Sequence, residues 1–240
     1  QIRRLEPYRV READSGFIFM NKNENPYDLP VSLKQSVLNA AMANSWSRYP
    51  PIVAQDLHRL IAQYAGWVPE GVVAANGSDE TILITLTTFL EPGKRLVLPT
   101  PTFPMFAYMA SLIGATVDQV PLNEDYSYNP DALFERFLDS GDMLVICSPN
   151  NPTGHLCPAD RIEDILSRTD APVVIDEAYY EFSKVTALEY LKRYPNLIIL
   201  RTLSKAFSLA GQRLGYALAA PEIAEELLKV KLPFNIDQFS

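Results

Sequence analysis

Short apolar runs alternate with longer amphipathic segments from Val72 onward, and this alternation constrains the fold more than any other feature of the sequence. We read the apolar runs as strands at 72–75, 95–98, 116–120, 143–147, 173–175, 197–200 and 214–218. Helical patterns separate them, at 79–90, 103–113, after Asn129-Pro130, and at 158–167, 187–193 and 221–231. Strands that alternate with helices build a largely parallel sheet covered on both faces. We therefore predict a doubly wound α/β domain.

The region before this alternation has a different character. Residues 1–26 are predicted to form an extended arm, and residues 27–240 a large domain. Pro30 opens a segment over 31–44 whose apolar residues recur at helical spacing, and a second helix is expected over 53–65. With 240 residues, of which 48% are hydrophobic, the chain can bury a sizeable core.

Charge and hydropathy narrow the class of partner. The formal net charge is −8, whereas nucleic acids are bound by basic faces, so we expect no nucleic-acid partner. No apolar run approaches the roughly 18 residues of a membrane span, and the start of the chain has no apolar signal core. Cys147 and Cys157 lack a metal-type spacing. We predict a cytoplasmic protein that acts on small molecules, with reduced thiols, no metal and no membrane partner.

Polar or aromatic side chains follow five of the predicted strands directly. These segments are 76–80, 99–103, 148–154, 176–179 and 202–205. In open α/β sheets, ligands bind at the carboxyl ends of the strands. We therefore expect these segments to form one site.

A lysine, two small hydroxyl residues and an arginine lie close together after the strand at 197–200. Lys205 follows this apolar strand, so burial and a neighbouring cation can lower its pKa and leave an amine free for Schiff-base chemistry. Thr202 and Ser204 supply hydroxyl groups, and Arg213 can clamp a phosphate in bidentate fashion. For this segment taken alone, a solvated loop is the plainer reading.

Three further residues fit a site at this edge. Asp176 lies at the mouth of an apolar strand, where an unpaired charge is costly, so it needs a cationic partner; a turn cap is the alternative. Tyr179 can direct its hydroxyl to the same cavity or simply pack. Asn151 precedes a proline, which restricts its backbone to extended conformations and displays its side-chain amide, although a plain turn also explains the sequence.

Two more segments complete the candidate site. Ser78, Asp79 and Glu80 begin a predicted helix, whose free backbone N–H groups form an anion site; an ordinary N-cap by Ser78 is compatible with this. Asp79 and Glu80 would contribute through their backbone, because their carboxylates repel phosphate. Phe103 can stack on a heteroaromatic ring or pack in the core.

These motifs resemble those of the fold-type I pyridoxal-phosphate aminotransferases. The resemblance rests on Asn-Pro-Thr-Gly at 151–154, Asp-Glu-Ala-Tyr at 176–179, and Ser204-Lys205 followed by Arg213. The nearer match is to the histidinol-phosphate aminotransferases, through the segments 23–27, 48–50, 77–80, 91–93 and 203–207. The resemblance covers nearly the whole chain, and it implies the large domain of that fold.

The resemblance also implies a role for each residue. Pyridoxal 5'-phosphate would be the cofactor, with Lys205 as its Schiff-base lysine and proton carrier, and with Asp176 paired to the pyridinium nitrogen. Asn151 and Tyr179 would hydrogen-bond the phenolic oxygen, and Phe103 would stack on the ring. The phosphate would be held by Thr202, Ser204, Arg213 and the helix start at Ser78, Asp79 and Glu80.

Substrate contacts and assembly are implied as well. Tyr49 of the Arg-Tyr-Pro segment would reach the phosphate in a neighbouring subunit, which implies a homodimer. Asn25, Tyr27 and Asn235 are the candidate substrate-binding residues. Members of the family continue for roughly a hundred residues as a C-terminal small domain carrying the substrate-binding arginine, and we expect that domain to be absent from this chain.

The resemblance implies transfer of an amino group between L-histidinol phosphate and 2-oxoglutarate, a step of histidine biosynthesis. An aromatic or other amino-acid aminotransferase and a threonine-phosphate decarboxylase are the nearest alternatives. A catalytically silent fragment that keeps the cofactor fold is the alternative of another class.

Overall fold

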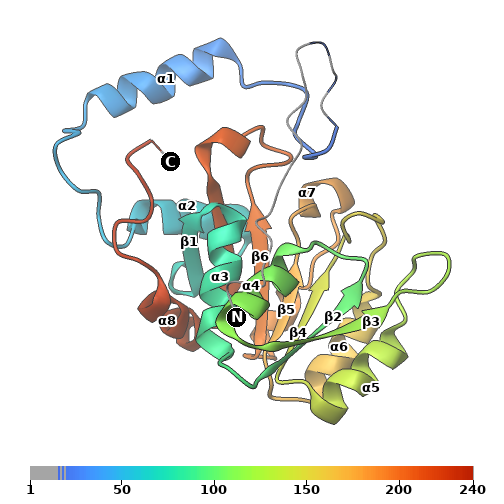
Figure 1. Cartoon of the computed structure of the whole chain (residues 1–240). Coiled ribbons are helices and arrows are strands. Elements are labelled where there is room, and N and C mark those ends of the chain that lie inside the picture. The colour runs from blue at the N-terminus through green and yellow to red at the C-terminus, as the bar shows by residue number, and fades with distance from the viewer. Residues whose placement is uncertain (1–15, 17, 19, 240) are drawn as a thin grey trace.

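Seven strands form one mixed sheet between two layers of helices in the computed structural model, which describes residues 16, 18 and 20–239 (Figure 1). The strand order is β1-β7-β6-β5-β4-β2-β3. The pairs from β3 across to β6 are parallel, whereas β7 runs antiparallel to both β6 and β1. The strands are β1 (Val72–Asn76), β2 (Arg95–Thr100), β3 (Thr116–Pro121), β4 (Met143–Cys147), β5 (Val173–Asp176), β6 (Leu197–Thr202) and β7 (Leu214–Ala219). The prediction of a doubly wound, mostly parallel α/β sheet is confirmed.

Helices cover both faces of this sheet. They are α2 (Gln55–Ala65), α3 (Gly77–Phe89), α4 (Met105–Ile113), α5 (Pro130–Ser140), α6 (Ala159–Ser167), α7 (Tyr180–Ser183) and α8 (Pro221–Val230), with 3-10 turns η2 (Pro69–Gly71), η3 (Leu188–Lys192) and η4 (Ala210–Gln212). Asn129 caps α5 as predicted, because its side chain accepts a hydrogen bond from the Ala132 N–H at 3.2 Å.

Alternation along the strands divides the apolar side chains into two cores. Val72 and Ala74 face α2, α5 and α6, whereas Val73 and Ala75 face α3, α4 and α8. Strands β4 and β5 are buried along their whole length, as expected for strands covered on both faces. Each fully buried Leu, Ile or Val stabilises the fold by about 1.5–3 kcal/mol. The central strands are therefore a rigid base for the residues that follow them.

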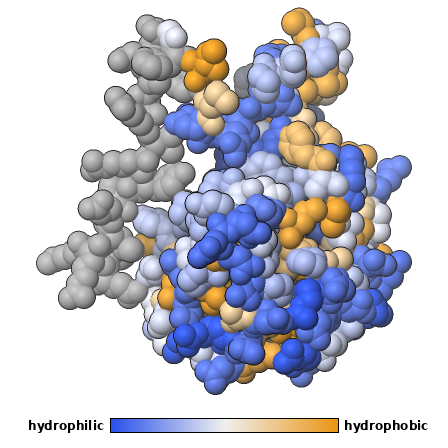
Figure 2. All heavy atoms as spheres, turned by 90° about the vertical axis from the view of Figure 1, so that its right-hand side faces the viewer, coloured by the Kyte–Doolittle hydropathy of each residue, from blue (hydrophilic) through white to orange (hydrophobic). Residues whose placement is uncertain are grey.

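The helix α1 (Val31–Met42) forms where the sequence predicts it, and most of its apolar side chains are exposed. Of its residues only Ala41 is buried, and Val31 and Met42 keep 80% and 70% of their surface exposed. The helix stands apart from the sheet layers, and hydrophobic side chains show in the upper part of the molecule, where α1 and the segment before it lie (Figures 1 and 2). Helical spacing predicted the helix but not what covers its apolar side chains.

Several strands continue beyond their apolar runs. Ladder pairing extends β5 to Asp176, opposite Leu200, and β6 to Thr202, opposite Gly215. These polar residues are thus held by the sheet rather than by loops. Among the described residues, no helix has both the length and the apolar character of a membrane span. Most of the predicted arm, 1–15, 17 and 19, lies outside the described residues.

Candidate active site

The predicted segments meet at the carboxyl edge of the sheet. Cys147 at the end of β4 pairs with Asp176 at the end of β5, and the Ser148 N–H donates to the Asp176 carbonyl oxygen at 2.8 Å. The Ser204 N–H donates to Thr202 Oγ1 at 3.1 Å, and Thr202 ends β6, whose Leu200 pairs with Asp176 on the neighbouring strand. The start of α3 approaches the same place through Arg213. The structure thus brings most of the predicted site residues together.

Asp176 is buried, with 6% of its surface exposed, and it forms no ion pair with any described residue. Its carboxylate accepts a hydrogen bond from the Ala178 N–H at 3.0 Å and a weak one from the Cys147 thiol at 3.7 Å. Burial raises the pKa of Asp176 to about 6, although these two donors act in the opposite direction. The cation that the sequence requires for Asp176 is therefore not supplied by the described part of the chain.

Lys205 lies within electrostatic range of Asp176. Burial lowers the pKa of the Lys205 amine below its usual value, against the opposing effect of Glu24 and Asp79. Nζ donates a hydrogen bond to the backbone carbonyl of Lys22 at 2.8 Å. Nζ thus donates to a carbonyl rather than to a carboxylate, and burial outweighs the nearby carboxylates, so Lys205 is suited to act as a nucleophile.

The amino end of α3 and Arg213 form a compact anion cradle. Asn76 precedes the helix without a side-chain cap, so the first N–H groups of α3 have no partner within the helix. Gly77 has a φ of 78°, and a Cβ there would lie 2.3 Å from Arg213 Nη2. A Cβ on Gly215 would lie 2.3 Å from the Ser78 nitrogen. Only glycine permits this approach, which places a guanidinium beside free N–H groups.

The acidic residues at the start of α3 are directed to protein partners. Asp79 Oδ2 lies 3.4 Å from Arg213 Nη2, and Glu80 Oε2 accepts from the Asn76 N–H at 2.5 Å. Their carboxylates are thus engaged, in agreement with a backbone role toward an anion. The helix begins at Gly77 with Asn76 before it, so the plainer alternative of an N-cap at Ser78 does not apply. Ser78 lies inside the first turn because ladder pairing carries β1 to Asn76.

Thr202 and Ser204 present a hydroxyl pair beside this cradle. Their side-chain oxygens lie 3.0 Å apart, and both residues are buried. Thr202 Oγ1 also lies 3.5 Å from the Leu214 carbonyl oxygen, which ties the pair to β7. Each hydroxyl can donate one hydrogen bond and accept others, so the pair can bind phosphate oxygens.

The two asparagines after β4 have different environments. Asn150 is buried and fixes the neighbouring loop: its Nδ2 donates to the Pro101 carbonyl at 3.0 Å, and its Oδ1 accepts from Thr102 Oγ1 at 2.7 Å. The Asn151 side chain forms no hydrogen bond within the described residues and remains available. Phe103 contacts Phe106 edge-on, with ring centroids 6.4 Å apart, and it packs against the hydrophobic core beneath α4.

The segment before α1 lies across the site. Asn23 Nδ2 donates to the Tyr179 hydroxyl at 2.9 Å, and Asn25 Nδ2 donates to the Ala206 carbonyl at 3.3 Å. Among the described residues, the partner of Tyr27 is Asn25, whose Oδ1 accepts a hydrogen bond from the Tyr27 N–H at 3.0 Å, and the Tyr27 ring is exposed. Burial raises the pKa of Tyr179, so its hydroxyl keeps its proton at neutral pH.

The remaining predicted residues lie at the rim. Asn235 donates to Glu80 Oε2 at 2.7 Å and accepts from Lys231 Nζ at 2.6 Å, so it borders the start of α3. Tyr49 stacks on Phe234 with centroids 4.5 Å apart and is 80% exposed. It does not reach the cradle of its own chain through any described contact.

The arrangement suits a phosphorylated ligand with a basic ring. A phosphate fits the cradle of free N–H groups, the hydroxyl pair and Arg213. A protonated ring nitrogen fits the buried carboxylate of Asp176, which lacks a cation, and the nearby amine of Lys205 can bond to a carbonyl carbon. The donor set therefore fits pyridoxal phosphate.

Sequence reasoning missed four residues that shape this site: Thr102, Asn150, Glu177 and Arg201. Asn150 and Thr102 carry no pattern that separates them from ordinary loop residues. Arg201 did leave a signal, because a charged residue directly after four apolar ones in a central strand requires a buried partner.

Comparison with known proteins agrees with this geometry. The histidinol-phosphate aminotransferase of Thermococcus kodakarensis is 41% identical over 240 residues, covering all of this chain and 70% of the relative. That of Chlorobaculum tepidum is 40% identical, covering 96% of this chain and 67% of the relative. The chain thus spans about two thirds of the length of these relatives.

A solved structure is similar as well. The histidinol-phosphate aminotransferase from Sinorhizobium meliloti, in complex with pyridoxal-5'-phosphate, matches with a TM-score of 0.83 and 26% identity, covering 91% of this chain and 60% of that one. The family profile for aminotransferase class I and II matches residues 15–240. On this match and these relatives, the chain belongs to the aminotransferase class I and II family.

Proposed function

We propose that this chain carries the cofactor site of a pyridoxal 5'-phosphate-dependent aminotransferase. The observation that carries the proposal is a buried Asp176 that forms no ion pair with any residue described in the structure, together with the Lys205 amine, whose pKa is lowered and on which Asp176 acts electrostatically. When bound, pyridoxal phosphate supplies an electron-accepting ring that stabilises negative charge at the carbon bearing the amino group.

The residues of the chain would divide the work between holding and proton transfer. Asp176 would keep the ring nitrogen protonated, and Lys205 would hold the cofactor covalently and then carry the proton at the reacting carbon. Asn151 and Tyr179 would bind the phenolic oxygen, and Phe103 would cover one face of the ring. The phosphate would be bound by Ser78, Asp79 and Glu80 through their backbone, and by Thr202, Ser204 and Arg213.

L-histidinol phosphate and 2-oxoglutarate are the proposed substrates. The proposal is supported by relatives of that name at 40% and 41% identity over nearly the whole chain. Asn25, Tyr27 and Asn235 would contact the substrate, since all three border the site from the arm or from the segment after α8.

A homodimer in the cytoplasm is the proposed setting. Its support is the exposed apolar surface of α1 together with Tyr49, whose ring stacks on Phe234 and is 80% exposed. Sedimentation velocity tests the assembly: a monomer at micromolar concentration would contradict it.

Lys205→Ala tests the proposed function, with Lys192→Ala as a control at an exposed lysine. We expect borohydride reduction to leave the cofactor covalently attached to the unmodified chain. In a separate, unreduced sample, histidinol phosphate should convert the bound cofactor to the pyridoxamine form. Lys205→Ala should lose the reduced adduct and at least about 10³-fold in turnover, while the control keeps both. Persistence of adduct and turnover in Lys205→Ala would refute the proposal.

The same assay separates the alternatives. A higher kcat/KM for phenylalanine than for histidinol phosphate would indicate an aromatic aminotransferase, and release of carbon dioxide from threonine phosphate a decarboxylase. Retention of reduced cofactor without turnover would indicate a cofactor-binding fragment.

A further inference from the structure

Glu177 and Arg201 form a fully buried ion pair directly behind the candidate site. Each exposes 1% of its surface. Arg201 Nε and Nη2 lie 3.0 and 2.8 Å from the same carboxylate oxygen, Glu177 Oε2. Among the salt bridges of the described residues, this is the one whose two side chains are both almost completely removed from water. A pair this deep is costly to bury unless its remaining hydrogen-bonding groups are satisfied.

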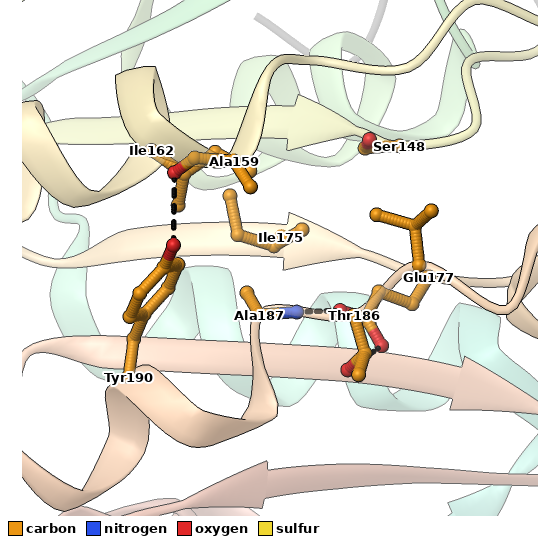
Figure 3. Close-up of a pocket in the computed structure, with 9 residues that line it drawn as sticks. Ser148, Ala159, Ile162, Ile175, Glu177, Thr186, Ala187 and Tyr190 are labelled. Carbon is orange, nitrogen blue, oxygen red and sulfur yellow. Dashed lines mark hydrogen bonds between the residues drawn. The ribbon is translucent and has the colours of Figure 1, made fainter.

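The surroundings satisfy this pair. Thr186 Oγ1 donates to Glu177 Oε2 at 2.9 Å and accepts from Arg201 Nη2 at 2.8 Å, while the Ala187 N–H donates to Glu177 Oε1 at 2.7 Å. The guanidinium of Arg201 lies over the ring of Tyr180, with Cζ 3.8 Å from the ring centroid. Figure 3 shows Glu177 beyond the tip of β5, with Thr186 and Ala187 beside the end of that strand, next to a small cavity.

The position of the pair relates it to the site. Glu177 is the next residue after Asp176, and Arg201 immediately precedes Thr202. Successive side chains on a strand point to opposite faces, so the pair joins β5 and β6 on the face opposite to Asp176 and Thr202. The Glu177 N–H also donates to the Leu200 carbonyl at 2.8 Å, which continues the ladder to this point. The pair therefore fixes the spacing of the two strand ends that carry two site residues.

Charge relates the pair to Asp176 as well. Asp176 is affected electrostatically by Glu177 and by Asp79, and it is in contact with the Cys147 thiol. It acts in turn on Lys205, Tyr179 and Tyr128. Of these groups, Glu177 is adjacent to Asp176 in the sequence, and its carboxylate is paired with Arg201.

We propose that Glu177 and Arg201 are a positioning pair for the cofactor site: the pair fixes the ends of β5 and β6, and Arg201 offsets part of the negative charge with which Glu177 acts on Asp176. This inference rests on the proposed function, because it concerns the ionisation of Asp176 opposite a cationic ring. The pair touches neither cofactor nor substrate.

Opposite charge changes at the two positions give the test. Arg201→Gln leaves Glu177 uncompensated and makes the site more negative, whereas Glu177→Gln leaves Arg201 uncompensated and makes it more positive. The readout is the pH midpoint of the absorbance change of bound pyridoxal phosphate, which reports protonation of the nitrogen contributed by Lys205. We expect the midpoint to rise in Arg201→Gln and to fall in Glu177→Gln, each by roughly 0.5 pH unit or more.

Two further variants keep the test decisive if a single variant fails to fold. The double variant Glu177→Gln/Arg201→Met removes both charges, so it should restore the midpoint to within roughly 0.2 pH unit of the unmodified chain. Arg193→Gln, which breaks an exposed ion pair with Glu163 at 2.6 Å, is the control and should leave the midpoint unchanged. The Kd for pyridoxal phosphate, measured by fluorescence quenching, should rise about tenfold in Arg201→Gln and change little in the control.

The outcomes separate this inference from the function beneath it. Midpoint shifts of the same sign in the two single variants would overturn the inference. A midpoint in the double variant that returns to that of the unmodified chain, after a shift in either single variant, would support it. Unchanged midpoints in both folded single variants also overturn it. Failure of the unmodified chain to bind pyridoxal phosphate would overturn the proposed function and this inference together.

Discussion

Asp176 and Glu177 are adjacent, acidic and almost equally buried, yet their surroundings differ completely. Glu177 has a bidentate arginine, a threonine hydroxyl and a backbone N–H around its carboxylate. Asp176 has one backbone N–H and a thiol. Both carboxyl groups have a raised pKa because of burial, but within the part of the chain that the structure describes a cation opposes that effect directly at Glu177 and not at Asp176.

The difference teaches where to look for a ligand. A buried charge is retained only when something compensates it. The chain itself compensates Glu177, which identifies that face of β5 as structural. On the other face the described residues leave Asp176 uncompensated, which indicates that a cation arrives with a ligand, next to Lys205 and the anion cradle at α3.

The largest expected effect concerns the structural face. Arg201→Met leaves the Glu177 carboxylate buried without a cation, so the free energy of unfolding should fall by about 3–5 kcal/mol. Arg193→Met, at the half-exposed pair with Glu163, should cost no more than about 1 kcal/mol. Urea denaturation of both variants measures the difference, and equal losses would contradict the contrast between the two faces.

A smaller effect of opposite sign is expected on the ligand face. The pKa of Asp176 is raised to about 6 in the folded chain, so between about pH 4 and 6 the folded state keeps a proton that the unfolded state has lost. The contribution of Asp176 to the stability of the cofactor-free chain therefore falls as pH rises through this window and is level above it, whereas buried His58, whose pKa is lowered to about 4, contributes with the opposite sign and is present in both proteins compared below.

Asp176→Asn removes the loss of stability that ionised Asp176 causes in the cofactor-free chain. Without cofactor, the variant should be more stable than the unmodified chain above pH 6, by up to about 3 kcal/mol, and the gain should vanish near pH 4. Unfolding curves at pH 4, 6 and 8 provide the measurement. A variant that is less stable at pH 8 would show that Asp176 is compensated after all.

The sequence predicted the sheet and much of the site for a physical reason. Apolar runs define buried strands, and the carboxyl ends of parallel strands converge, so Asp176, Thr202 and Lys205 could be assigned to one edge without coordinates. The chemistry of their side chains then identified Lys205 as a candidate Schiff-base amine and Arg213 as a candidate phosphate ligand. Their roles toward a cofactor remain predictions.

Other features depend on tertiary contacts that local pattern does not encode. Helical spacing predicted α1, but it did not indicate that Val31, Leu33, Val37, Leu38 and Met42 stay exposed in the structure. The contact between the Lys22 carbonyl and Lys205 joins residues 183 positions apart, with no local signal at either. Glu177 and Arg201 are 24 positions apart, and their pairing follows from adjacent strand ends rather than from a motif.

Nuclear magnetic resonance of pyridoxal phosphate labelled with ¹⁵N in its ring tests the central claim most directly. If Asp176 is the uncompensated carboxylate that receives a cationic ring, the bound nitrogen should be protonated at pH 8 in the unmodified chain and unprotonated in Asp176→Asn. An unprotonated nitrogen in the unmodified chain, or the same state in both proteins, would contradict the account.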